Sequence, residues 1–281
     1  MSLPYTWKLP DPASALPLVF DSPHSGTDLP LDMQCVAPPK ALMSACDAFI
    51  DELWSGALAH GAALLAAHFH RTYIDLNRSR YDIDPVLLDQ PWPGKLETSE
   101  KSKAGMGLIR RLALPGVPMY DRKLSVAEVQ ARLQDYYIPY HETLRERLDV
   151  LHARFGKVWH IDCHSMKSVG NAMNIDAGAP RPDFVVSDRN GSSADPQFTS
   201  WIAQQVRELG YSVKINDPYK GAELVSAYAA PAQQRHSIQI EINRRLYMDE
   251  ERFTPNAGFF DLQDKLTQLS ARIAGYVRAG I

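Results

Sequence analysis

The chain has 281 residues, of which 45% are hydrophobic and 22% charged, with a formal net charge of −3 and a pI near 6.3. This balance gives no electrostatic reason to expect nucleic acid or an anionic membrane as a partner. No run of about eighteen apolar residues is present, so no spanning helix is predicted. The N-terminus lacks the basic and apolar regions of a secretory signal, and three cysteines without C-x-x-C spacing favour a cytoplasmic protein.

Strand-like runs and helical patterns alternate from the N-terminus onward. Residues 16–20 (LPLVF) have the composition of a buried strand and end at the loop DSPHSG. Residues 47–61 follow, with apolar side chains at helical spacing and Gly61 as a stop signal. Residues 62–80 are interpreted as a second strand that leads to a polar end.

The middle of the chain is rich in proline and glycine. Residues 81–120 interrupt every periodic pattern, which indicates a lid or a binding surface. Residues 125–156 are predicted to be helical, because Ser125 and Glu128 form a capping box, with a kink or division at Pro139. The remaining expected elements are strands at 157–163, 183–187, 211–217 and 237–246, a helix at about 196–209 and a C-terminal amphipathic helix around 262–277.

This order of elements predicts an α/β fold. We expect one domain over residues 1–281, a three-layer α/β/α sandwich with a central mixed sheet, in which residues 81–120 form a loop-rich, lid-like segment. In open sheets of this class, ligands bind beyond the carboxyl ends of the strands.

The stretch HIDCHSM (160–166) places two histidines, an aspartate and a cysteine in or beside a predicted strand. The two-residue period of a strand puts His160, Asp162 and His164 on one face. Burying such a face unpaired is unfavourable. A satisfied polar network and a functional site both explain this pattern when it is taken alone.

Three other strand-like segments also lead to polar groups. They carry His24, the pair Asn77 and Arg78, and Glu241. Because the ends of neighbouring parallel strands meet at one edge of a sheet, we expect these groups to converge with His164. Convergence of four such ends favours a functional site.

The residue types suit a mononuclear zinc hydrolase, whose metal takes three protein ligands and a water. His24 and His164 are the expected imidazole ligands. Asp47, at the start of the next helix, is the expected carboxylate ligand, although it could instead be only the helix N-cap. Thr27 excludes an H-x-x-E arrangement. The other candidate carboxylates are Asp21, Asp28 and Asp162.

Glu241 lies in a strand whose isoleucines occupy the opposite face. It is the expected general base for a metal-bound water. The alternative is a structural ion pair with Arg244 or Arg245.

Two arginines suit an anionic substrate. Asn77 and Arg78 are expected to clamp a carboxylate, and Arg71 is expected to polarise the scissile carbonyl. Surface salt bridges are the alternative for both arginines.

Other classes of function fit less well. Serines lie beside both histidines, but no G-x-S-x-G motif is present, which disfavours a serine hydrolase. A non-catalytic module that binds zinc or a small molecule remains the alternative from another class.

The ordered motifs DSPHSG, DLNR, GLIRR, YYIPYH, IDCHSM, NDPYKG and EINRRLYMDE resemble the N-formylglutamate amidohydrolase family. The resemblance implies a phosphorylase/hydrolase-like fold similar to zinc carboxypeptidases, with His24 and His164 as zinc ligands, Asn77 and Arg78 on the substrate carboxylate, and Glu241 as the base. The implied reaction is hydrolysis of N-formyl-L-glutamate to formate and L-glutamate, a step in histidine degradation.

The acyl group is the open part of this hypothesis. Deacylases similar to aspartoacylase or succinylglutamate desuccinylase would use the same zinc, base and clamp on a small anionic N-acyl amino acid. Arg110, Arg111 and Lys220 are the residues expected to meet the second carboxylate of glutamate.

Overall fold

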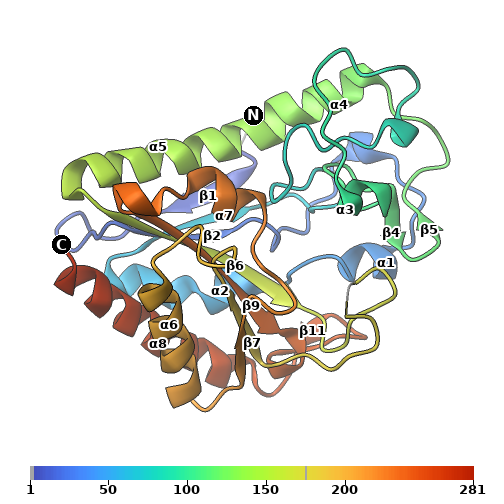
Figure 1. The fold of residues 1–281 in the computed structure, drawn as a ribbon. Helices are drawn as coiled ribbons and strands as arrows, with labels where there is room; N and C mark the ends of the chain where they lie inside the picture. Colours follow the sequence, from blue (N-terminus) through green and yellow to red (C-terminus); the bar gives the residue numbers. More distant parts are fainter. Residues whose placement is uncertain (1–2, 175) are drawn as a thin grey trace.

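A seven-stranded mixed sheet forms the centre of the computed structural model, which describes residues 3–174 and 176–281 (Figure 1). The strand order is β1-β3-β2-β6-β9-β7-β8, with antiparallel pairing at β1–β3 and β9–β7 and parallel pairing elsewhere. The expected central mixed sheet is confirmed. The strands are β1 (Tyr5–Lys8), β2 (Leu18–Ser22), β3 (Ala63–Ala67), β6 (Val158–Met166), β7 (Phe184–Ser187), β8 (Val213–Ile215) and β9 (Arg235–Asn243).

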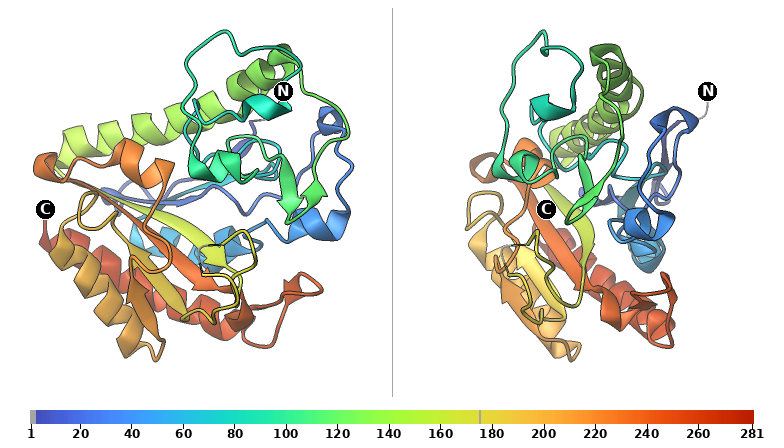
Figure 2. Two further views of the ribbon diagram at one scale, coloured as in Figure 1. Left: turned by 45° about the vertical axis from the view of Figure 1, so that its right-hand side comes forward. Right: turned by 90° about the vertical axis from the view of Figure 1, so that its right-hand side faces the viewer.

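Helices cover both faces of the sheet, as Figure 2 shows in two further views. One apolar core joins the sheet to α2, α6 and α8, and a second joins the opposite face to α4, α5 and α7. The three-layer sandwich is therefore confirmed. The helices are α1 (Pro39–Met43), α2 (Ile50–Leu53), α3 (Glu100–Lys103), α4 (Val126–Arg132), α5 (Ile138–Phe155), α6 (Pro196–Glu208), α7 (Glu223–Tyr228) and α8 (Phe259–Ala279). Within the described ranges, none of them is long and apolar enough to cross a bilayer.

Side chains along β6 and β9 alternate between an apolar face and a polar face of the sheet. Ile238, Ile240 and Ile242 of β9 are fully buried in the core shared with α6 and α8. The intervening residues of β9, including Glu241, point to the other face. Parallel pairing sets His164 of β6 beside Glu241 of β9, so two expected site residues are neighbours near the ends of these strands.

The long helical segment starts and divides as the sequence predicts. Ser125 accepts a hydrogen bond from the Glu128 backbone, and the Glu128 carboxylate accepts one from the Ser125 backbone. A π-helical turn at Leu133–Tyr137 then separates α4 from α5. Pro139 lies in the first turn of α5, directly after this π-helical turn.

Two expectations about local structure were wrong, and two elements were missed. Residues 47–61 form only the short α2 and a 3-10 segment, Ser55–His60, although this segment ends at Gly61 as predicted. Gly56 packs so closely on α8 that a Cβ would lie 2.1 Å from Thr267 Oγ1. The second strand ends at Ala67, so Asn77 arrives on a loop. Strand β1 and helix α7 were not predicted.

The segment 81–120 has little regular structure, as its composition predicts. It holds a 3-10 turn at Pro85–Leu87, the short α3, and a two-stranded ribbon of β4 (Leu112–Leu114) and β5 (Val117–Pro118). A second small ribbon, β10 (Met248–Asp249) with β11 (Thr254–Pro255), follows β9. The other 3-10 turns are Leu31–Met33, Pro231–Gln233 and Arg244–Leu246.

Candidate active site

Three buried side chains meet beyond the carboxyl ends of β2 and β6. His24 follows β2, His164 lies near the end of β6, and Asp47 precedes α2. The Asp47 backbone N–H donates to the His24 carbonyl at 2.9 Å, which ties the two loops together. Gly26 lets the His24 loop pass close to β3, since a Cβ there would lie 2.4 Å from the His68 carbonyl carbon.

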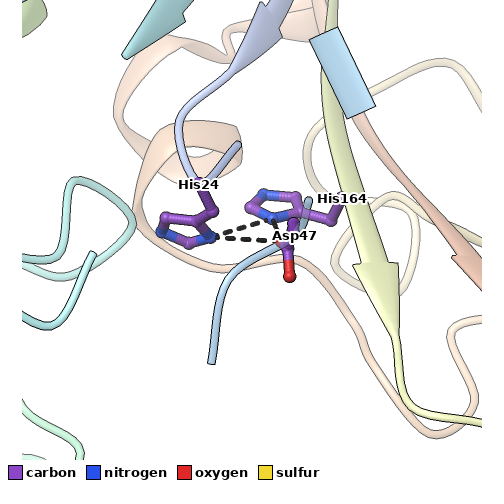
Figure 3. A group of neighbouring side chains, drawn as sticks. All are labelled: His24, Asp47 and His164. Carbon is purple, nitrogen blue, oxygen red and sulfur yellow. Dashed lines mark hydrogen bonds and ion pairs between the residues drawn. The ribbon is translucent and has the colours of Figure 1, made fainter. Parts of the chain in front are cut away.

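The facing atoms of these side chains form a small triangle (Figure 3). His24 Nδ1 lies 3.1 Å from His164 Nδ1 and 3.5 Å from Asp47 Oδ2, and His164 Nδ1 lies 3.0 Å from the same oxygen. Ligands bound tetrahedrally at the zinc–nitrogen distance of about 2.0–2.1 Å lie about 3.3–3.4 Å apart. The triangle therefore fits a mononuclear metal site of two imidazoles and one carboxylate.

Each imidazole is held on its outer nitrogen by a second carboxylate. His24 Nε2 lies 2.7 Å from Asp75 Oδ1, and His164 Nε2 lies 2.7 Å from Asp162 Oδ1. Such carboxylates fix the tautomer and orientation of metal-binding histidines and increase their basicity. Both histidines thus present Nδ1 to the centre of the triangle.

The remaining oxygen of Asp47 is held by a buried arginine. Arg244 Nη2 donates to Asp47 Oδ1 at 2.9 Å, and Arg244 Nε donates to Ser165 Oγ at 3.0 Å. The side chain of Asp47 does not cap α2, whose N-cap is Phe49. The alternative that Asp47 is only a helix cap does not agree with these contacts.

The other candidate carboxylates lie away from the triangle. Asp21 is hydrogen-bonded to Tyr140, Asp28 is exposed, and Asp162 stands behind His164. None of the three reaches the space enclosed by the facing nitrogens.

The charges of the triangle suit a cation. Burial opposes ionisation, but hydrogen bonds from His164 and His24 hold the pKa of Asp47 well below its usual value. Burial also disfavours charged His164, yet Asp162 and Asp47 hold its pKa well above its usual value. Burial and Arg71 lower the pKa of His24, which keeps that ring neutral. A metal must therefore displace a proton from His164 to bind.

Glu241 lies on the wall of the cavity that opens from the triangle. Its Oε1 accepts a hydrogen bond from Gln239 Nε2 at 2.8 Å, and burial raises its pKa to about 7. The structural alternative for Glu241 was wrong, because Arg244 pairs with Asp47 and Arg245 pairs with Asp183 at 2.7 Å.

The cavity has a volume of about 660 Å³, and three arginines lie on its wall near the triangle. Arg71 Nη2 pairs with Asp75 Oδ2 at 2.8 Å, so a surface salt bridge does not describe it. Arg78 donates to backbone carbonyls at Met106 and at its preceding residue. Arg110 is 8% exposed and, among the described residues, its Nε has no hydrogen-bond partner.

Asn77 does not present a free amide to the cavity. Its Nδ2 lies 3.0 Å from His164 Nε2 and 3.2 Å from Asp162 Oδ2, and its Oδ1 accepts from the Leu224 backbone. The expected carboxylate clamp therefore loses one of its two members, because this amide already bonds within the protein.

Lys220 and Arg111, the two other cations expected near the substrate, differ in their position relative to the cavity. Lys220 is exposed at the rim of the cavity. Arg111 turns away and pairs with Asp84 at 2.8 Å, so it was wrongly expected to meet the substrate.

Asp75 and Arg244 belong to the site but were not predicted as site residues. Asp75 stands within the motif YIDLNR, only two positions before Asn77, and Arg244 follows β9 directly. Their nearness to the polar strand ends is the signal that the sequence offered.

Comparisons with known proteins give one consistent answer. A family model described as N-formylglutamate amidohydrolase matches residues 16–248. N-formylglutamate deformylases of Pseudomonas aeruginosa and Pseudomonas putida are 32% and 31% identical to the chain over 241 and 245 residues, covering 84% and 85% of it and the same shares of the relatives.

Solved structures agree with this match. The crystal structure of N-formylglutamate amidohydrolase from Ralstonia eutropha is 46% identical, covers 100% of both chains and superimposes with a TM-score of 0.95. A gene product of Agrobacterium tumefaciens is 17% identical, with a TM-score of 0.69 over 99% of this chain and 96% of that one, which shows a shared fold.

Proposed function

The chain belongs to the N-formylglutamate amidohydrolase family, and we propose that it hydrolyses N-formyl-L-glutamate to formate and L-glutamate with zinc held by His24, Asp47 and His164. The observation that carries the proposal is the triangle of facing atoms, 3.0–3.5 Å apart, with a carboxylate behind each imidazole. Bound there, zinc would supply Lewis acidity toward the formyl oxygen and lower the pKa of a water molecule.

Glu241 is the general base of this reaction. It accepts a proton from the attacking water and returns it to the leaving nitrogen as the C–N bond breaks. A buried carboxyl group with a pKa of about 7 exists in both protonation states near neutral pH, which suits this double role. Gln239 keeps its carboxylate oriented.

Arg71 stabilises the negative charge that develops on the formyl oxygen. Its Nη1 lies 3.8 Å from Asp47 Oδ2, so the guanidinium stands beside the proposed ligands. Asp75 accepts hydrogen bonds from its Nε and Nη2, which fixes the planar group in the dry interior of the site.

Arg78 and Arg110 receive the carboxylates of glutamate. A buried guanidinium without a hydrogen-bond partner is unfavourable until an anion satisfies its donors. The Nε of Arg110 has no hydrogen-bond partner among the described residues, and its Nη2 lies 3.9 Å from Asp75 Oδ2, so donors are left for a substrate anion, which supports a role in substrate binding. Lys220 adds a positive charge at the rim, and Asn77 Nδ2 donates to Asp162 Oδ2, which helps to fix the carboxylate behind His164.

Residues 81–120 supply the wall opposite β6 and β9 and close the cavity over the substrate. Asp82, Glu97, Ser99, Lys101 and Arg110 of this segment line it. We propose that the whole chain works as one domain, because strands, loops and this segment contribute to the same cavity.

The test is an assay of the purified protein against N-formyl-, N-acetyl- and N-succinyl-glutamate and N-formyl-aspartate, with and without a metal chelator. We expect N-formyl-glutamate to exceed N-acetyl-glutamate by more than about tenfold in kcat/KM, since an extra methyl group must find space beside the metal. The chelator should abolish turnover and added zinc should restore it. Comparable turnover of the acetyl or succinyl compound would move the chain to another deacylase specificity.

A further inference from the structure

A second, smaller cavity of about 100 Å³ adjoins the triangle on the Asp47 side. It shares Asp47, Arg71, Arg110 and Ser165 with the larger cavity, so the two spaces meet beside the proposed metal ligands. Glu241 lines only the larger one. The smaller cavity is not needed to explain the roles assigned above.

The smaller cavity is strongly cationic. Its walls carry Arg71, Arg110, Lys167, Arg181 and Arg244 but only one carboxylate, Asp47. Four of these cations lie beside carboxylates: Arg71 pairs with Asp75, Arg244 with Asp47 and Arg181 with Asp176 at 2.7 Å, and Arg110 Nη2 lies 3.9 Å from Asp75 Oδ2.

Lys167 is the cation of these walls that has no carboxylate partner within ion-pair distance among the described residues. It is half-buried, and its Nζ donates only to Ser44 Oγ, at 3.1 Å. Glu250 acts on Lys167 and raises its pKa, but the Glu250 carboxylate accepts from the Ser168 backbone.

The electrostatics of Lys167 agree with a missing anion. Burial and the positive charge of Arg244 lower its pKa to about 8, and Arg110 and Arg181 act in the same direction. A small anion within hydrogen-bond reach of Lys167 would offset this repulsion and accept from its ammonium group.

Resting on the proposed function, we propose that this cavity is a separate binding site for formate, held by Lys167 after the C–N bond breaks. Formate is the smallest anion in the reaction, and it acquires its negative charge only on hydrolysis, when the water oxygen has joined the formyl carbon. The larger cavity, with Arg78, Arg110 and Lys220, remains for glutamate. Formate and glutamate can then occupy the protein together.

The first test is double inhibition of the wild-type enzyme by formate and L-glutamate. Separate sites predict intersecting lines in a plot of reciprocal rate against formate at several glutamate concentrations. Parallel lines mean mutually exclusive binding and would overturn the proposal. This measurement needs no variant, so it does not depend on whether a substitution is tolerated.

The second test compares Lys167→Met with Lys40→Met. Lys40 lies on α1 and pairs with Glu251, and it lines neither cavity, so it controls for the loss of a lysine charge. We expect the inhibition constant of formate to rise by at least about tenfold in Lys167→Met, as for loss of a charge-assisted hydrogen bond, and to stay unchanged in Lys40→Met. The inhibition constant of glutamate should change in neither.

An unchanged formate constant in Lys167→Met overturns the proposal, as does a rise for glutamate instead of formate. Failure of the proposed function is distinguishable from both. If the wild type releases no formate from N-formyl-glutamate, the reaction assignment fails. Direct titration of zinc-loaded wild type and Lys167→Met with ¹³C-formate, followed by NMR line broadening, still reports whether the cavity binds the anion.

Discussion

Asp75 Oδ1 lies 2.7 Å from His24 Nε2, on the side of the imidazole that faces away from Asp47 and His164. Asp162 stands in the same relation to His164. Both carboxylates are fully buried, so neither is screened by solvent. These two carboxylates thus orient both imidazoles so that their Nδ1 atoms face the centre of the triangle.

This relationship predicts that Asp75→Asn weakens zinc binding by about 10–100-fold, the usual effect of removing such a carboxylate. Competition with a chromogenic chelator measures the affinity. Asp84→Asn is the matched control: Asp84 is equally buried and pairs with Arg111 at 2.8 Å, but it lies away from the cavity. Equal zinc affinity in Asp75→Asn and the wild type would contradict the role given to Asp75.

The triangle predicts about one zinc per chain, because one set of three ligands holds one ion. Elemental analysis should find that His164→Ala and His24→Ala lose most of this metal, while the variant His152→Ala, at a half-buried histidine of α5, keeps it. Zinc affinity should increase with pH, since the raised pKa of His164 means that the metal competes with a proton. A double variant of both site histidines that retained full zinc would exclude this site.

Glu241→Gln preserves the shape of the side chain but removes the base. We expect kcat to fall by about 100-fold or more while zinc content is retained. In the wild type, kcat/KM should decrease as the pH drops below about 7, because only the ionised carboxylate accepts a proton. Glu223→Gln, on the wall of the same cavity, serves as the control and should keep a kcat close to that of the wild type. Loss of zinc from Glu241→Gln would instead identify Glu241 as a ligand.

The sequence predicted the parts of the site that depend on strand ends. The period of β6 and β9 placed His164 and Glu241 on one face, and the end of β2 led to His24. These predictions rest on local geometry, which a sequence expresses directly. Asn77 was assigned a different role because its loop turns the amide inward, toward His164 and the backbone of α7.

Contacts between residues far apart in the sequence could not be predicted from strand periodicity. Arg244 reaches Asp47 across the chain, and Asp75 reaches His24. Neither pairing leaves a periodic signal, since each depends on how loops pack after the sheet has formed. The same holds for residues 47–61, where close packing on α8 at Gly56 accompanies a tighter helical turn than the pattern predicts.

Arg110 and Arg111 are adjacent and chemically identical, so only the fold assigns them different roles. Arg110 faces the cavity with an unpartnered Nε, whereas Arg111 pairs with Asp84. A hydrogen bond to a charged group contributes about 1.5–3 kcal/mol, so Arg110→Met should raise KM for N-formyl-glutamate about tenfold to a hundredfold. Arg111→Met should leave KM near the wild-type value and act only on stability, which a thermal melt detects. If the two variants had the same KM, recognition of the substrate carboxylates would have to lie with other cations of the glutamate cavity, such as Arg78 and Lys220.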